Sequence, residues 1–196
     1  MSNLFKYFFL IISLYSSVSL HAQLQLNKIS GIEGLSQNTV KSIIQDSNGF
    51  IWVGTYNGIN KYDGYSMVHY NFSNDVNSLS SNIIISLFED KDGYIWAGTT
   101  DAGLNRIDPR TGKIDVYFDN PNASDYASEI DHIYQSSSGV LFINTSKGIK
   151  FFNVAIDGSL LFEEVMNVAN NFSLRIKTII PAVNGKHWFF TPERKI

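Results

Sequence analysis

Short runs of apolar residues alternate along this chain with turns that contain glycine, asparagine or aspartate. Four successive runs cover residues 40–44, 50–55, 59–62 and 66–70, and four more cover 84–88, 94–99, 104–107 and 113–118. The runs are rich in branched and aromatic residues and too short for helices, so they predict β-strands. Each group of four predicts one four-stranded antiparallel sheet.

One ten-residue phrase, Asp46 to Thr55, returns as Asp90 to Thr99 after 90 − 46 = 44 residues. Both copies read Asp-x-x-Gly-x-Ile-Trp-x-Gly-Thr. The frame recurs more loosely at Gly139, Phe142 and Thr145, and again at Gly185, Trp188 and Thr191. A repeat of roughly 40 to 50 residues made of short strands is typical of a β-propeller blade.

Superposing the four copies predicts which positions are buried. The equivalent apolar sets are Val40, Ile84, Ile130 and Ile176; Ile43, Leu87, Ile133 and Ile179; and Ile44, Phe88, Tyr134 and Ile180. The residues that we expect to define the repeat are Gly49, Trp52, Gly54, Gly93, Trp96, Gly98 and Gly103. Because the tryptophans recur at fixed places in the repeat, we interpret them as core packing residues rather than as platforms on which a sugar stacks. The glycines would allow another backbone or a large ring to approach closely within the sheet.

The prediction is therefore an all-β fold of about three and a half four-stranded propeller blades in an open arc. A leucine-rich or ankyrin array would need a helical segment in every unit, and none is predicted. The expected repeats cover 34–77, 78–122, 123–168 and a shortened 169–196.

The N-terminus has the organisation of a secretory signal peptide. Lys6 precedes an apolar stretch from Tyr7 to Leu14, and small and polar residues lead to Ala22. We expect a signal peptide over 1–22, with cleavage after Ser19 as the second choice, and an exported, periplasmic chain from residue 23. An uncleaved anchor is the alternative, because residues 4–20 are nearly long enough to span a bilayer. No membrane span is predicted in the mature chain.

Composition excludes several kinds of function. The net charge is −3, without a cluster of basic residues, which argues against nucleic-acid binding. The chain has no cysteine, so disulfides, thiolate metal sites and a cysteine nucleophile are excluded.

No catalytic, metal or cofactor site is predicted. The loops at Asp46 and Asp90 superficially resemble calcium loops but lack the remaining oxygen ligands, and self-capping turns explain them better. No histidine pair has metal-binding spacing. Asp131-His132 is the only acid next to a histidine, and we interpret both as ordinary residues of a repeat strand.

The tandem phrase, together with Asn38, Asn82, Gly58-Ile59 and Gly103-Leu104, resembles the two-component regulator propeller repeat. That resemblance implies the extracytoplasmic sensor portion of a membrane histidine kinase, often a hybrid kinase, from bacteria that degrade polysaccharides. It implies a glycan as the ligand and a chain that is itself not an enzyme. The match weakens along the chain, since Phe142 replaces tryptophan and Asn144 replaces glycine in the third copy.

Propellers of this family have more blades than the repeats found here. We therefore expect a fragment that lacks downstream blades and the kinase, with an uncovered blade face. Leu24 to Ile29 is the expected donor strand for a closing blade.

One rim of a propeller carries the loops that lead into the innermost strands and those between the second and third strands. The candidate ligand-binding residues on this rim are Asn38, Tyr56, Asn57, Asn82, Thr100 and Asp101. Amides, a hydroxyl, a carboxylate and an aromatic ring suit an oligosaccharide. Asn38 and Asn82 recur, however, so holding a turn is an equally simple role for them. The alternative functions are a secreted propeller enzyme of the polysaccharide lyase type and a protein-interaction scaffold.

Overall fold

The computed structural model describes residues 34–119, 122, 129–145, 148–155, 158–162, 178–181 and 187–190. The first sheet contains β1 (Val40–Gln45), β2 (Ile51–Thr55), β3 (Gly58–Tyr62) and β4 (Met67–Tyr70). The second contains β5 (Ile84–Glu89), β6 (Ile95–Thr99), β7 (Leu104–Ile107) and β8 (Ile114–Tyr117). The third contains β9 (His132–Gln135), β10 (Leu141–Thr145), β11 (Gly148–Val154) and β12 (Leu160–Phe162). A two-stranded sheet contains β13 (Thr178–Pro181) and β14 (His187–Phe190).

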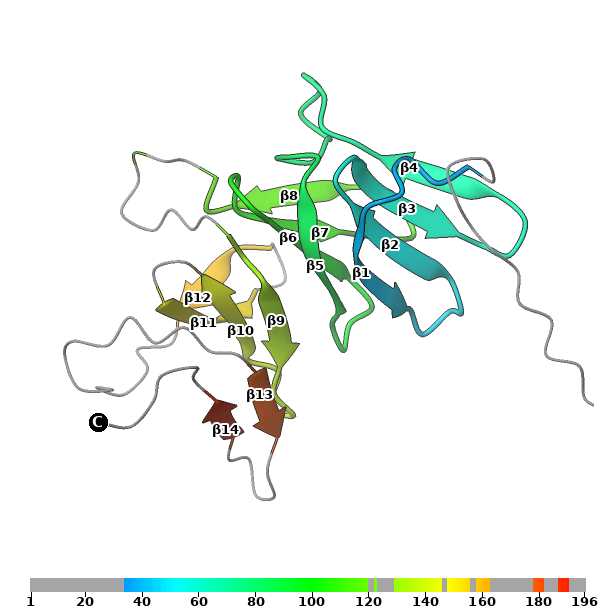
Figure 1. Cartoon of the computed structure of the whole chain (residues 1–196). Helices are drawn as coiled ribbons and strands as arrows, with labels where there is room; N and C mark the ends of the chain where they lie inside the picture. The colour runs from blue at the N-terminus through cyan, green and yellow to red at the C-terminus, as the bar shows by residue number, and fades with distance from the viewer. Residues whose placement is uncertain are drawn as a thin grey trace, which may run out of the picture.

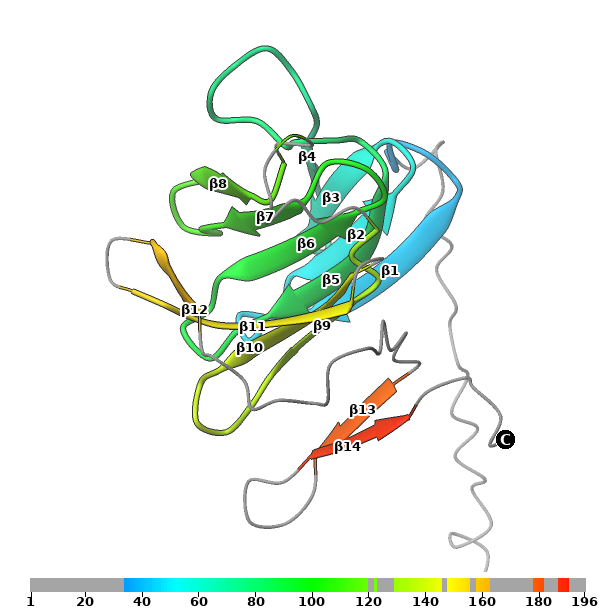
Figure 2. The same cartoon turned by 90° about the vertical axis from the view of Figure 1, so that its left-hand side faces the viewer.

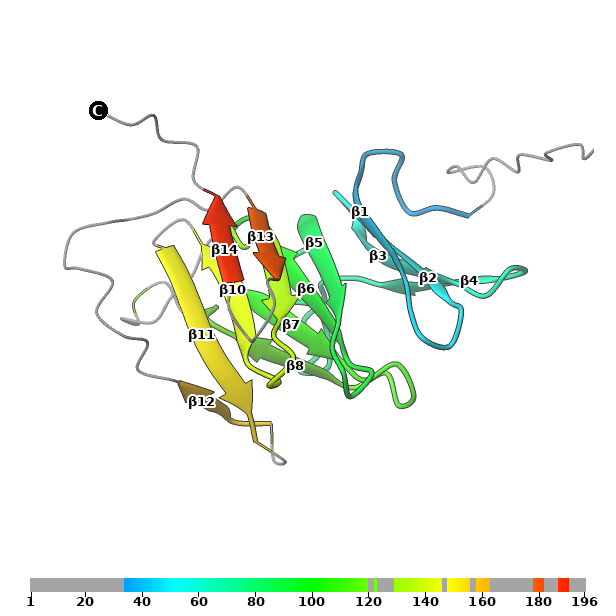
Figure 3. The ribbon, with the colours of Figure 1, turned by 90° about the horizontal axis from the view of Figure 1, so that it is seen from below.

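Every sheet is an antiparallel meander, in which each strand pairs with its neighbours in the sequence. Figure 1 shows the first three sheets side by side in chain order, and Figure 3 shows them following one another around an arc. The inner strands β1, β5 and β9 are neighbours, with β1 in contact with β5 and β5 with β9 (Figure 2). The predicted all-β, open arrangement of four-stranded blades is confirmed.

The turn between the first two strands of each blade is built by its aspartate. Asp46 Oδ1 accepts hydrogen bonds from the backbone N–H groups of Asn48 and Phe50, at 3.0 and 2.9 Å. Gly49 completes the turn with φ +89°, a conformation that favours glycine. The second copy repeats these bonds at Asp90, so both turns are self-capping, as the sequence indicated.

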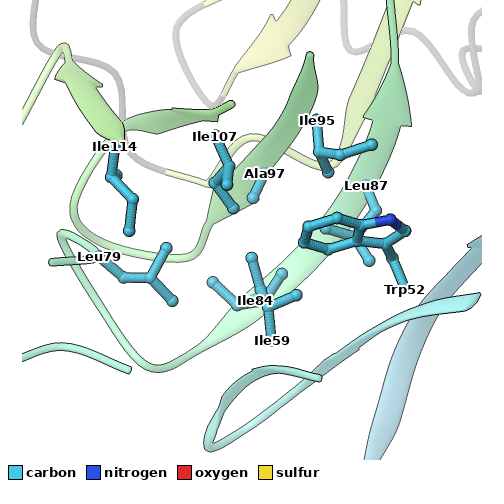
Figure 4. Close-up of a cluster of buried hydrophobic side chains, with 9 residues drawn as sticks. All are labelled: Trp52, Ile59, Leu79, Ile84, Leu87, Ile95, Ala97, Ile107 and Ile114. Carbon is cyan, nitrogen blue, oxygen red and sulfur yellow. The ribbon is translucent and has the colours of Figure 1, made fainter. Parts of the chain in front are cut away.

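A core of apolar side chains lies between the first and second sheets (Figure 4). Its fully buried members include Trp52 and Ile59 from the first sheet, and Ile84, Ile95 and Ala97 from the second. A matching core between the second and third sheets contains Trp96, Leu104, Ile130, Ile143 and Phe152. Burial of such side chains, at about 1.5–3 kcal/mol each, stabilises the stack of blades.

The repeat glycine of β2 lies at a point of close approach between sheets. A Cβ on Gly54 would come within 2.8 Å of Ile84 Cγ2. On Gly98 it would overlap the carbonyl oxygen of Ile130. Gly54 therefore lets β5 approach its sheet at Ile84, and Gly98 does the same for Ile130, two residues before β9.

Two of the predicted core positions are wrong. Ile43 is 62% exposed and Val40 is 38% exposed, whereas their equivalents Leu87 and Ile84 are 8% and 0% exposed. Leu87 and Ile84 face the preceding sheet, near Gly54. Among the described residues no sheet precedes β1, so the same positions of the first blade face outward.

Several predictions concern residues outside the described part of the chain. They are the signal peptide over 1–22, the donor strand from Leu24 to Ile29, and the repeat positions Ile176, Gly185 and Thr191. Within the residues described, the structure contains no apolar helix of membrane-spanning length.

Candidate functional site

The edge of the arc where β1, β5 and β9 begin is called here the upper rim. Because β2 runs antiparallel to β1, with Val40 opposite Thr55, the loop after β2 lies on this rim beside the segment that leads into β1. The same pairing of Ile84 with Thr99 brings the loop after β6 to the start of β5. The loops that carry the six candidate residues therefore lie along one rim, as the repeat pattern predicted.

Hydrogen bonds between backbone groups join these loops from blade to blade. Gly58 N donates to Asn82 O at 2.7 Å, which connects the first blade to the second. Within the second blade, Thr100 N donates to Ile83 O at 3.3 Å, and Glu129 N donates to Thr100 O at 2.9 Å, which connects the second blade to the third. The upper rim is thus a continuous, braced row of loops.

One of the exposed candidate side chains is aromatic. Tyr56 is 43% exposed, and Lys41 Nζ lies 5.2 Å from the centroid of its ring. Asn57 is also exposed, and its Nδ2 donates to Ser36 O at 3.4 Å. Asn38 and Asp101 are exposed on the same rim.

Asn82 and Thr100 are less accessible than these four. Both are half-buried, and Asn82 Oδ1 accepts a hydrogen bond from Phe72 N at 2.8 Å. Asn82 therefore holds the loop between the first two blades. Its recurrence in the sequence is explained by this local role.

Two serine–asparagine pairs that support the rim were not predicted from the sequence. Ser36 N donates to Asn60 Oδ1, and Ser80 N donates to Asn105 Oδ1, both at 2.9 Å. The two asparagines are fully buried in β3 and β7. The sequence feature that could have revealed these pairs is the dipeptide Leu-Ser, which occurs at 35–36 and again 44 residues later at 79–80.

The upper rim of the third blade carries a titratable cluster. Asp131 Oδ1 accepts a hydrogen bond from Asn144 Nδ2 at 2.7 Å and lies 3.2 Å from His132 Nδ1. Partial burial raises the pKa of Asp131, but the bonds from His132 and Asn144 outweigh it and the pKa lies below its usual value. The bond to Asp131 raises the pKa of His132 against the effect of partial burial.

This cluster differs from the interpretation made from sequence, in which both residues belong to a strand. β9 begins at His132, so Asp131 precedes it, and the two side chains interact with each other. Among the described residues, no group of three acidic, histidine or cysteine side chains is placed to hold a metal ion. At Asp46, both carboxylate oxygens already accept hydrogen bonds from N–H groups.

Comparison with known families finds a similarity to the repeat in two segments of the chain. The model for the two component regulator propeller matches residues 34–57 and 78–101. These two segments are similar to the two-component regulator propeller repeat. The matched segments contain the upper-rim loops of the first two blades and the two Asp-to-Thr phrases.

Relatives of this repeat chain include sensor proteins. Histidine kinase P4 of Formosa agariphila is 39% identical over 66 residues, which is 32% of this chain and 5% of the kinase. The extracellular domain assigned to a hybrid two component system of B. thetaiotaomicron is 30% identical, with a TM-score of 0.68. That match covers 83% of this chain and 23% of the other.

A second extracellular domain from B. thetaiotaomicron, assigned to a one component system, is 28% identical with a TM-score of 0.65. The match covers 90% of this chain and 26% of that domain. Virginiamycin B lyase from Staphylococcus aureus, at 17% identity and a TM-score of 0.58 over 89% of this chain and 55% of the lyase, shares the fold alone. The present chain therefore spans 5% of the length of the kinase and 23% of the length of the hybrid-system extracellular domain.

Proposed function

We propose that this chain forms part of the extracellular sensor propeller of a two-component system and binds its ligand on the upper rim without transforming it. The observation that carries the proposal is the tandem regulator propeller repeat, whose rim loops are braced to one another across blades. Loops held by a rigid scaffold are where recognition usually resides. The similarity to an extracellular domain of a hybrid system supports the same role.

The proposed ligand is an oligosaccharide. Tyr56 offers an exposed ring on which a sugar can stack, and Lys41 lies beside it. Asn38, Asn57 and Asp101 offer amide and carboxylate groups to hydroxyls along the same rim. Asn82 and Thr100 contribute through the backbone bonds that hold these loops in place.

In the intact receptor, the proposed partner is a histidine kinase on the other side of the membrane. The chain would then be exported, and the signal peptide over 1–22 would direct it to the periplasm. Ligand contact on the rim would alter the arrangement of the blades that connect to the membrane.

A glycan array with two matched tyrosine variants tests the rim. Tyr56→Ala removes the exposed ring of the upper rim, and Tyr65→Ala removes a 98% exposed ring from the turn between β3 and β4 at the opposite edge. Loss of one stacking ring is expected to weaken binding about tenfold. The proposal predicts this loss for Tyr56→Ala only. Equal binding by both variants and the unaltered chain would contradict it.

A secreted lyase is the second function considered. The Asp131–His132 pair on the third blade is the one acid–histidine pair that the described rim offers to such chemistry. The likeness to virginiamycin B lyase bears on the fold alone, and fold alone does not select a reaction. The sensor therefore remains the proposed function.

A further inference from the structure

The upper rim of the first blade brings a lysine to the exposed ring of Tyr56. The register of β1 against β2 shifts between Val40 and Ser42, so Lys41 is the extra residue of a β-bulge. A bulge redirects the side chain of its extra residue. Here the Lys41 ammonium lies 5.2 Å from the centroid of the Tyr56 ring, and both residues are exposed. The first blade therefore presents an aromatic ring and a cation at one place on its rim.

This pair departs from the repeat at both positions. In the second blade β5 carries the same bulge, but its extra residue is Ile85, and Thr100 stands in the place of Tyr56. The third-blade equivalent of Lys41 is Asp131, which follows Ile85 after 46 residues. The bulge thus belongs to the blade fold, whereas the ring and the cation are additions of the first blade. Packing of a blade does not explain them.

The charge of the rim differs from blade to blade. The two rim segments of the first blade, residues 34–41 and 56–58, contain no acidic residue, and Lys41 is their single charged side chain. The corresponding segments of the second blade carry Asp101 as their single charged side chain. Within the part of the chain that the structure describes, no carboxylate forms an ion pair with Lys41. The first-blade end of the rim is therefore electropositive and attracts anions.

The chemistry of the two side chains favours one kind of sugar. A tyrosine ring offers an apolar face to the carbon–hydrogen face of a sugar. A lysine ammonium has three donors and no acceptor, and its hydrogen bonds to anionic oxygens are stronger than those to neutral hydroxyls. At 5.2 Å from the ring centroid, the ammonium is within reach of an anionic group at the edge of a sugar that stacks there. The pair therefore favours a sugar with an anionic substituent over a neutral one.

We propose that the oligosaccharide bound on the upper rim is acidic, with a carboxylate or a sulfate ester on Lys41 and the sugar that carries this group stacked on Tyr56. This inference rests on the proposed function, because it specifies the ligand of the same rim. Both anionic groups offer the oxygens that a lysine ammonium binds, and their sources are uronic acids and sulfated sugars respectively.

A glycan array with paired oligosaccharides tests the proposal on the full chain. Uronic acid oligosaccharides are printed beside their carboxyl-reduced forms, and sulfated oligosaccharides beside their desulfated forms. The retained members are expected to be acidic. Removal of the anionic group should weaken binding about tenfold, which is the effect of one hydrogen bond to a charged group. The set of pairs in which this loss occurs distinguishes the carboxylate from the sulfate ester.

Three variants assign the preference to Lys41. Lys41→Gln removes the charge and should bind the acidic and the neutral member of each pair equally, while Lys41→Arg should keep the preference. Lys91→Gln is the matched control, because it removes the same charge from an exposed position in the turn between β5 and β6, at the opposite edge. It should bind as the unaltered chain does. Thermal unfolding followed by circular dichroism checks that each variant is folded.

The results separate this inference from the proposed function. Retention of neutral oligosaccharides, equal binding within every pair, an unchanged preference in Lys41→Gln or the same loss in Lys91→Gln would overturn the acidic ligand and leave a sugar-binding rim in place. Retention of no oligosaccharide, or binding that Tyr56→Ala does not weaken, would overturn the proposed function together with the inference.

Discussion

The indole of Trp52 donates a hydrogen bond from Nε1 to Asp46 Oδ2 at 2.8 Å, and both side chains are buried. Trp96 and Asp90 repeat this bond at 2.7 Å in the second blade. The same carboxylate also caps the turn through its other oxygen. The repeated phrase is therefore one structural unit, in which a turn residue fixes the orientation of a core tryptophan.

Substitution of the turn aspartate is expected to destabilise the fold strongly. In Asp90→Asn, an amide N–H group would face the Trp96 indole N–H, or else the two turn N–H groups would lose their acceptor. A buried donor without a partner costs about 1–3 kcal/mol. We expect the free energy of unfolding, measured with urea, to fall by about 2–3 kcal/mol.

Asp92→Asn is the matched control in the same turn. Asp92 is exposed, and its substitution should change the free energy of unfolding by less than about 0.5 kcal/mol. Similar losses for the two variants would show that the indole bond is not the cause.

The two glycines of the second blade should respond differently to alanine. Gly98→Ala places a Cβ against the Ile130 carbonyl oxygen, a backbone atom that cannot give way without moving the third sheet. We expect a loss of more than about 3 kcal/mol. Gly93 has φ +81° and open space around a Cβ, so Gly93→Ala should cost only about 1 kcal/mol. Thermal or urea unfolding compares them, and a larger loss for Gly93→Ala would contradict the close-approach role.

The outward position of β1 predicts an asymmetry between equivalent residues. Leu87→Ala removes a side chain from the core between the first two sheets and should cost about 2–4 kcal/mol. Ile43→Ala removes a side chain that is 62% exposed and should cost less than about 1 kcal/mol. Equal costs in urea unfolding would indicate that a further part of the chain covers Ile43.

The Asp131–His132 pair predicts a pH dependence. The folded pKa of His132 is raised, so its contribution to stability is complete below the unfolded value of 6.5 and is lost as the pH rises through the folded pKa. The folded pKa of Asp131 is lowered, so its contribution is present above 3.8 and is lost as the pH falls through the folded pKa. The pair therefore stabilises most between about pH 4 and 6.5. Both side chains are partly exposed, so the effect should not exceed about 0.5 kcal/mol.

An NMR titration of the His132 imidazole measures this effect at its source. Asp131→Asn removes the carboxylate and should lower the pKa of His132 toward 6.5. Asp92→Asn, which lies in another blade, should leave the titration unchanged. An unaltered titration in Asp131→Asn would exclude the ion pair.

The strands and turns were predictable because each blade is encoded locally. Alternating apolar runs and the Asp-x-x-Gly turn specify their own pairing, and the recurrence of Trp52 at Trp96 marks the packing position. The exposure of Ile43 was not predictable from superposition. Burial of that position depends on a neighbouring sheet rather than on the residue itself.

The sequence was sufficient to place the candidate site on one rim, but it did not assign a role to each residue of the site. The repeat geometry brought Tyr56, Asn57 and Thr100 to one edge, as predicted from the order of strands. Whether an asparagine faces solvent or holds a loop depends on long-range bonds, such as that from Phe72 N to Asn82 Oδ1. The bond from Ser36 N to Asn60 Oδ1 also required the fold, since it joins the segment before β1 to β3.

We propose that the chain recognises an oligosaccharide on its upper rim and leaves it intact. The most direct measurement incubates the purified chain with the oligosaccharides that it retains on a glycan array, and follows their mass over time. The account predicts bound sugars of unchanged mass, with binding lost in Tyr56→Ala and kept in Tyr65→Ala. Shortened products with an unsaturated end, abolished by His132→Ala, would identify a lyase instead and contradict the claim.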